Sequence, residues 1–119
     1  MKQSNGNVRP IVESLETRQM MSFSVPTGPA APTALIEASA TTSKITLTWT
    51  DNASNEIGFE IDRWNGHSWK FIGISGSNKT HYADSNLKAN TFYAYRVRAF
   101  NLFGRSRGAY NYAANTSAT

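Results

Sequence analysis

The sequence predicts an all-β domain, a sandwich of seven short antiparallel strands that follows an N-terminal tail. From residue 34 onward, short runs alternate between apolar and polar residues with a period of two, which is typical of strands with one buried face. Clusters of Gly, Asn, Asp and Ser separate these runs at short intervals. No helical pattern of useful length competes in this part of the chain, so two packed sheets are favoured.

The most regular alternation lies in residues 44–50, where Ile45, Leu47 and Trp49 fall on one face. This pattern predicts a strand whose apolar face enters the core. A second long alternation places Tyr93, Tyr95, Val97 and Ala99 on a buried face. The other expected strands are 34–38, 59–62, 69–74, 80–83 and 109–114.

A hairpin is expected at Asn65-Gly66, between Trp64 and the run 69–74. Asn-Gly readily adopts the two positive φ values of a type I′ turn, which joins antiparallel strands directly. Residues 101–108 are expected to form the loop before the last strand.

The first 30 residues are expected to form a flexible tail, and residues 31–117 the folded domain. All four prolines lie within the first 32 residues, and residues 22–32 have the composition of a linker. Residues 12–21 are a candidate short helix, with acidic residues early and Arg18 late, as the helix dipole favours. Such a helix is too short to be stable alone.

Length and composition exclude several classes of protein. A chain of 119 residues has room for one domain and a tail. Without cysteine there are no disulfides, thiolate nucleophiles or cysteine-bound zinc. No apolar run approaches the roughly 18 to 20 residues of a membrane span. The net charge of +4 is too small to favour nucleic acid as a partner. We expect a monomer.

Several segments resemble one family. They are Ala-Pro-Thr-Ala-Leu at 31–35, Leu-Thr-Trp-Thr-Asp-Asn at 47–52, Glu-Ile-Gly-Phe-Glu-Ile-Asp-Arg at 56–63, and the run at 87–101. Together they resemble a fibronectin type III domain of the kind common in bacterial surface and secreted proteins.

The resemblance implies an immunoglobulin-like sandwich of seven strands. In it, Trp49 would be the core tryptophan of the second strand. Tyr93 would form the tyrosine corner, with its hydroxyl returning to the backbone near Leu87. Ala89 stands where the family pattern usually has proline, so the turn there is expected to be slightly looser.

Residues 13–22 resemble a short Leu-Glu-Pro-Arg-x-Leu-Leu motif found near the N-termini of many planctomycete surface and extracellular proteins. Thr17 replaces the proline of that motif, and Met20 and Met21 replace its leucines. Both resemblances imply an extracellular or cell-surface location, and 13–22 is then a candidate targeting motif. No apolar core of a signal peptide follows Lys2.

The sequence predicts a non-catalytic protein without a cofactor. Its two histidines, His67 and His81, fall at a predicted turn and a predicted edge, and no hydrolase, zinc-protease or phosphate-loop motif is present. The oxygen-rich run 51–56 offers possible calcium ligands, but it lacks the spacing of an EF-hand loop. Capping of the turn by these side chains is the favoured interpretation, and no metal is expected.

Four arginines gather in residues 96–107. Arg96 and Arg98 share the outer face of a strand whose expected neighbour carries two outward acids, so cross-strand pairs are favoured. Arg105 and Arg107 remain as the free positive charges of a candidate binding loop.

Exposed aromatic side chains are the second candidate site. Trp64 has outward parity, and Tyr110 and Tyr112 follow the long loop. Such rings can stack on sugars, or they can pack across strands while Trp64 shields the hairpin. Both interpretations stay open, and packing is favoured.

The sequence therefore predicts a module for protein interaction, adhesion or spacing, with a carbohydrate-binding accessory module as the alternative. The expected partner is a protein or polysaccharide at the cell surface. The candidate binding residues are Trp64, Leu102, Phe103, Arg105, Arg107 and Tyr110.

Overall fold

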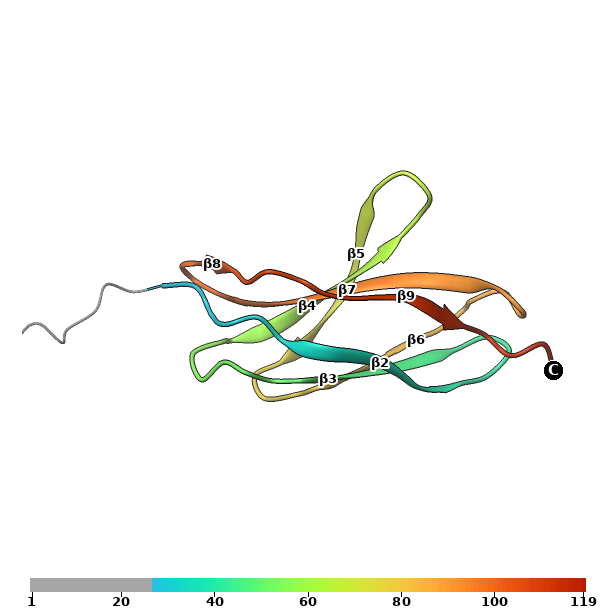
Figure 1. Ribbon diagram of the computed structural model, residues 1–119, viewed down its shortest axis with the longest axis horizontal. Helices are drawn as coiled ribbons and strands as arrows, with labels where there is room; N and C mark the ends of the chain where they lie inside the picture. Colours follow the sequence, from blue (N-terminus) through green and yellow to red (C-terminus); the bar gives the residue numbers. More distant parts are fainter. Residues whose placement is uncertain (1–26) are drawn as a thin grey trace, which may run out of the picture.

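The computed structural model describes residues 27–119, which form two antiparallel sheets packed face to face (Figure 1). The all-β sandwich expected from the sequence is confirmed. The candidate helix at 12–21 and the motif at 13–22 lie outside the described residues. The strands are β2 (Thr33–Ala40), β3 (Ile45–Thr50), β4 (Gly58–Trp64), β5 (Trp69–Gly76), β6 (His81–Asp84), β7 (Phe92–Asn101), β8 (Gly104–Arg105) and β9 (Ala109–Asn115).

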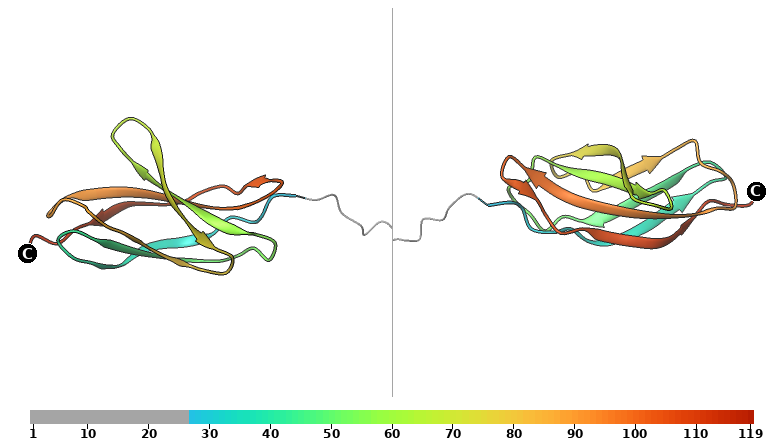
Figure 2. Two further views of the ribbon diagram at one scale, coloured as in Figure 1. Left: turned by 180° about the vertical axis from the view of Figure 1, so that it is seen from behind. Right: turned by 90° about the horizontal axis from the view of Figure 1, so that it is seen from above.

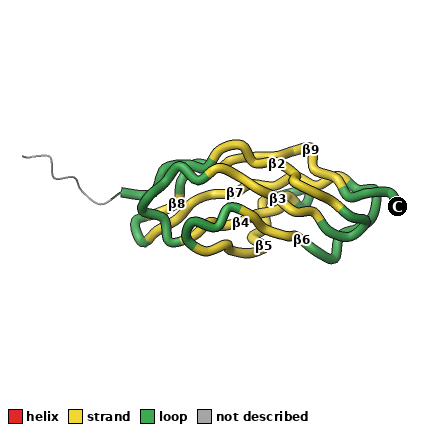
Figure 3. Tube along the Cα trace, turned by 90° about the horizontal axis from the view of Figure 1, so that it is seen from below, coloured by secondary structure: helices red, strands yellow, loops and turns green. Residues whose placement is uncertain are grey.

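The small sheet has the strand order β2-β3-β6, and the large sheet has the order β5-β4-β7 with β8 and β9 both paired to β7. β8 pairs with the end of β7 at Phe100 and Asn101, whereas β9 pairs with residues 92–97. The two therefore act as one edge strand with an interruption. Figures 2 and 3 show the two layers from other sides, with β9 beside β2. The described chain starts at one end of the sandwich, and the C-terminus lies at the other.

The core lies between the sheets, where the period-two alternation places it. The side chains of Ile45 and Leu47 from β3 are fully buried, as are those of Phe59 and Ile61 from β4. Trp49 is only 5% exposed, and its ring meets the ring of Phe59 edge to face with centroids 5.4 Å apart. The remaining buried apolar residues are Leu35, Tyr95, Val97, Ala99, Ala109 and Ala114.

A buried carboxylate links the two sheets. Asp84 on β6 accepts a hydrogen bond of 2.6 Å from the hydroxyl of Tyr95 on β7. Arg63 on β4 contacts both carboxylate oxygens of Asp84, at 2.8 and 2.6 Å. Burial and this carboxylate raise the pKa of the Tyr95 hydroxyl, so it stays a donor. The contact fixes the edge of the small sheet to the middle of the large one.

Tyr93 closes the connection between β6 and β7. Its hydroxyl accepts a hydrogen bond of 2.9 Å from the backbone N–H of Lys88, which is the geometry of a tyrosine corner. The neighbouring Leu87 packs against the core, and its N–H donates to the carbonyl of Ser43 at 2.9 Å. This connection is therefore tied to the turn between β2 and β3.

The β4–β5 hairpin is present, but the expected two-residue type I′ turn is wrong. Four residues separate the strands, and of Asn65 and Gly66 only the glycine has a positive φ, of 96°. The side-chain oxygen of Asn65 accepts hydrogen bonds from the N–H groups of His67 and Ser68, at 2.8 and 2.9 Å. The asparagine side chain closes the loop here, so no type I′ backbone is needed.

The expected loop 101–108 also contains more structure than predicted. The short strand β8 doubles back on β7, because Gly104 adopts a φ of 142° that other residues rarely take. Ser106, between β8 and β9, holds this segment against β7. Its N–H donates to the carbonyl of Ala99 at 2.8 Å, and its hydroxyl accepts from the Ala99 N–H at 2.9 Å.

Replacing Trp49 with alanine should lower the free energy of unfolding by roughly 3 to 5 kcal/mol, because a large cavity opens in the core. Trp49→Phe should cost less, since the indole Nε1 makes no hydrogen bond among the described residues and an aromatic ring would remain beside Phe59. Urea unfolding followed by circular dichroism measures both changes. Equal losses for the two variants would contradict this account of the core.

Replacing Tyr93 with phenylalanine should lower the free energy of unfolding by about 0.5 to 1.5 kcal/mol, because the Lys88 N–H loses its acceptor but water can partly replace it. The matched control is Tyr112→Phe, since Tyr112 is 69% exposed, and it should leave the unfolding midpoint unchanged. Equal urea midpoints for wild type and Tyr93→Phe would show that the corner hydrogen bond contributes nothing.

Candidate functional site

Residues 27–119 contain no group of three or more His, Cys, Asp or Glu side chains placed to hold a metal ion. Within the same residues, no helix is both long and apolar enough to cross a membrane. His67 lies in the β4–β5 loop and His81 begins β6, and both are exposed. The two histidines therefore do not form one site.

The candidate binding residues separate into two areas. Leu102 and Phe103 lie in the turn between β7 and β8, next to Ile57, and we call these three residues the loop tip. Trp64 and Tyr110 lie on the outer face of the large sheet together with Trp69 and Tyr112. We call these four the aromatic face.

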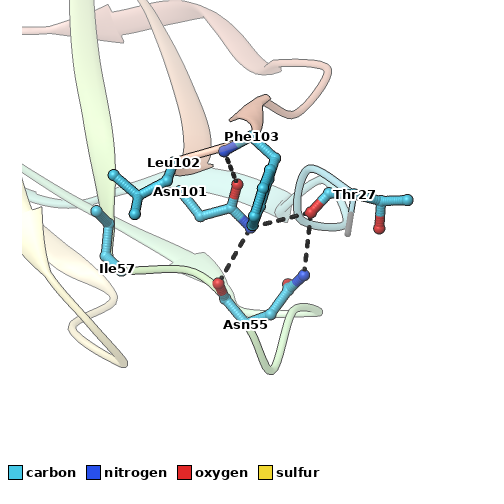
Figure 4. Close-up of a pocket in the computed structure, with 6 residues that line it drawn as sticks. All are labelled: Thr27, Asn55, Ile57, Asn101, Leu102 and Phe103. Carbon is cyan, nitrogen blue, oxygen red and sulfur yellow. Dashed lines mark hydrogen bonds between the residues drawn. The ribbon is translucent and has the colours of Figure 1, made fainter. Parts of the chain in front are cut away.

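The loop tip exposes large apolar side chains on a fastened backbone (Figure 4). Leu102 is 89% exposed and Phe103 is 63% exposed, and both line a shallow hollow of about 250 Å³. The side chain of Asn101 fixes this turn. Its oxygen accepts from the Phe103 N–H at 2.8 Å, and its amide donates to the carbonyls of Thr27 and Asn55 at 3.1 and 3.2 Å.

Glu56 holds the neighbouring β3–β4 loop from below. Its carboxylate is buried and accepts hydrogen bonds from the N–H of Asn78 at 3.0 Å and the hydroxyl of Ser77 at 3.5 Å. Burial acts to raise the pKa of Glu56, but the hydrogen bonds, chiefly that from Asn78, outweigh it and lower the pKa below its ordinary value. The next residue, Ile57, donates its N–H to the carbonyl of Phe100 at 2.9 Å. The ionised carboxylate thus helps to position the loop tip.

The oxygen-rich run 51–56 also fastens this loop. Asp51 accepts a hydrogen bond from the N–H of Ala53 at 2.9 Å. The amide of Asn52 donates to the carbonyl of Ala31 and the hydroxyl of Thr33, both at 3.0 Å. These side-chain atoms are engaged in binding the loop to itself and to the start of β2.

On the aromatic face, Trp69 lies at the centre of four rings in contact. Its ring centroid lies 5.4 Å from that of Trp64, 5.7 Å from that of Tyr110 and 6.4 Å from that of Tyr112. The two tyrosine rings are nearly parallel, with centroids 5.7 Å apart. A second hollow of about 250 Å³ is lined by Trp64, Trp69, Tyr112 and the small side chain of Ala94.

Sequence reasoning missed Trp69 as a site residue, although one signal for it was present. Trp64 and Trp69 flank the hairpin loop, and the register pairs them directly, so their rings must share a face. The guanidinium of Arg96 also lies over the Trp69 ring, 5.1 Å from its centroid. Gly108 leaves room for this arginine, because a Cβ there would approach the Arg96 side chain to 2.8 Å.

Ion pairs run along the same outer face. The register sets Asp62 opposite Arg96 and Glu60 opposite Arg98, as cross-strand pairing predicts. Asp62 contacts Arg96 at 2.7 Å and Arg98 at 3.3 Å, and Glu60 contacts Arg98 at 3.7 Å and Arg105 at 2.5 Å.

Two expectations about these charges are corrected. Asp62 belongs to the outer face but is only 3% exposed, because arginine side chains cover it. Arg105 is not a free charge, since its hydrogen bond with Glu60 pairs it and raises its pKa. Arg107 is exposed, and no carboxylate among residues 27–119 lies within 4.0 Å of its guanidinium.

Glu56→Gln should make stability less dependent on pH in the acid range. A carboxylate with a lowered pKa contributes stability that is present above its unfolded pKa of about 4.3 and lost as pH falls through its folded pKa. Urea unfolding at pH 7 and pH 3 should show a smaller drop for the variant than for wild type. Equal drops would contradict the position given to Glu56.

The family model of the fibronectin type III domain matches residues 30–111. The crystal structure of FN3tt is 25% identical, with a TM-score of 0.65, and the alignment covers 79% of this chain and 100% of that one. The fn3 domain of human collagen alpha-1(XX) chain is 21% identical, with a TM-score of 0.67 and coverage of 81% and 92%. The FN1-FN3 domains of chicken CNTN1 are 18% identical, with a TM-score of 0.66 and coverage of 76% and 33%.

No curated protein sequence matches. With a sandwich of this strand order, a buried Trp49 and a Tyr93 corner, the chain belongs to the fibronectin type III family.

Proposed function

We propose that this chain is a non-catalytic extracellular or cell-surface module for protein interaction, adhesion or spacing, and that it binds its partner through the loop tip. Domains of this family commonly serve as non-catalytic protein-interaction modules. The family is also common in extracellular proteins, which supports the proposed location. Residues 31–117 are proposed to act as one domain and as a monomer.

The exposure of Leu102 carries the proposal. A leucine side chain that is 89% exposed adds nothing to the core, and it stands beside the exposed rings and methyl groups of Phe103 and Ile57. Burying such side chains under a partner would yield about 25 cal/mol per Å² of apolar surface. Clusters of this kind mark interaction surfaces.

Hydrogen bonds hold the backbone of the loop tip in place, and this also favours binding. The Asn101 side chain bonds to three backbone groups around the turn, and the Glu56 carboxylate holds the adjacent loop. A partner would therefore meet a preorganised surface, and less conformational entropy would be lost on association.

The test is an array of purified cell-surface and extracellular-matrix proteins, probed with the full chain. At least one protein should bind, Leu102→Ala should weaken that binding about tenfold or more, and 500 mM NaCl should change it little, because the contact is apolar. The matched control is Ile36→Ala on β2, another exposed aliphatic residue at 54% exposure, which should bind as wild type does. Binding to no protein on the array, or equal losses in both variants, would contradict the proposal.

A further inference from the structure

We propose that the aromatic face is a second binding site, which takes a neutral polysaccharide chain by stacking sugar rings on the exposed rings of Trp64, Tyr110 and Tyr112, with Trp69 at their centre. This inference is independent of the protein-binding role proposed for the loop tip. It rests on the shape of the face, on the polar groups beside the rings and on the balance of charge there.

The shape comes from the β4–β5 hairpin. In the large sheet, β4 and β7 lie between β5 and β9, yet the ring of Trp69 on β5 contacts both tyrosines of β9. The hairpin must therefore bend over the outer face, and Figure 1 shows it projecting from the sandwich on that side. The small side chain of Ala94 leaves the hollow beneath, between Trp64, Trp69 and Tyr112.

The size of this hollow suits one ring-shaped unit. Its volume of about 250 Å³ lies below the range of about 300 to 1,000 Å³ that is usual for drug-sized ligands, and three of its four lining side chains are aromatic. Tyr110 does not line this hollow, and its ring centroid lies 5.7 Å from those of both Trp69 and Tyr112. An exposed ring outside the hollow gives a second sugar unit a contact, which fits a polymer of ring units better than a free monosaccharide.

The aromatic face combines apolar and polar groups, as a sugar does. A pyranose ring has an apolar C–H face, which can lie on an aromatic ring, and a rim of hydroxyl groups, which need hydrogen-bond partners. Tyrosine and tryptophan offer an apolar ring and one polar group each. Arg96 stands directly beside them, over the Trp69 ring, and remains partly exposed.

The charge of the face favours a neutral ligand. Its three guanidinium groups, on Arg96, Arg98 and Arg105, are already paired with the carboxylates of Asp62 and Glu60. These three guanidinium groups and two carboxylates leave a net charge of +1. An anionic chain would have to compete with these pairs, whereas a neutral chain can bind with the pairs intact.

Affinity gel electrophoresis of the full chain tests the proposal. The probes are barley β-glucan, xyloglucan, galactomannan and dextran as neutral polysaccharides, and alginate as the anionic one, each at 20 and 500 mM NaCl. At least one neutral polysaccharide should retard the protein equally at both salt concentrations. Tyr112→Ala and Trp64→Ala should weaken that retention about tenfold, and Ile36→Ala on the small sheet should leave it unchanged.

The two site variants are expected to fold, because Tyr112 is 69% and Trp64 is 40% exposed. Thermal unfolding within a few degrees of wild type confirms that a loss of retention belongs to the site.

Retardation by none of the four neutral polysaccharides overturns the proposal, as does retention that survives in Tyr112→Ala. Retardation by alginate alone, abolished by salt, overturns it in favour of simple charge attraction. If instead Tyr112→Ala abolishes binding to a protein of the array and no polysaccharide retards the chain, the face is a protein surface and the proposal fails.

Discussion

The burial of alternate side chains on β4 and β7 is the constraint on which the rest of the structure depends. Phe59 and Ile61 enter the core beside Val97 and Ala99, so the register between the two strands is fixed. A slip of β4 by one residue against β7 would turn Phe59 and Ile61 outward. The same register sets the acids of β4 opposite the arginines of β7 on the outer face. The core therefore decides which charges meet outside it.

The fold follows from the sequence where neighbours along a strand decide the outcome. Residues 44–50 show this, since their alternation alone indicates that Ile45, Leu47 and Trp49 are buried. The tyrosine corner needed the family resemblance, because its hydrogen bond joins Tyr93 to a backbone group five residues away. The exposure of Leu102 and Phe103 follows from their place in the expected loop 101–108, whereas Ile57, from the loop before β4, was not among the predicted site residues.

Contacts across the molecule were beyond sequence reasoning. The bond from Tyr95 to Asp84 joins the two sheets, so it requires knowledge of how they pack. The sequence predicts a free charge at Arg105, because its partner Glu60 is reached only through the short strand β8. Trp69 was missed as a site residue because its contacts with the β9 tyrosines depend on the bend of the hairpin. In each case the three-dimensional path of the backbone supplies the missing information.

The described chain begins at one end of the sandwich and finishes at the other, with β2 and β9 side by side between them (Figures 1 and 3). Tension applied between these ends would slide β2 and β9 past each other lengthwise. The bonds that join them are the Asn111 amide to the Leu35 carbonyl, at 3.1 Å, and the Asn115 N–H to the Glu37 carboxylate, at 2.8 Å. Both would be sheared together instead of being unzipped in turn. A domain held in this way loads both bonds at once, so it resists extension more than one whose bonds break in turn.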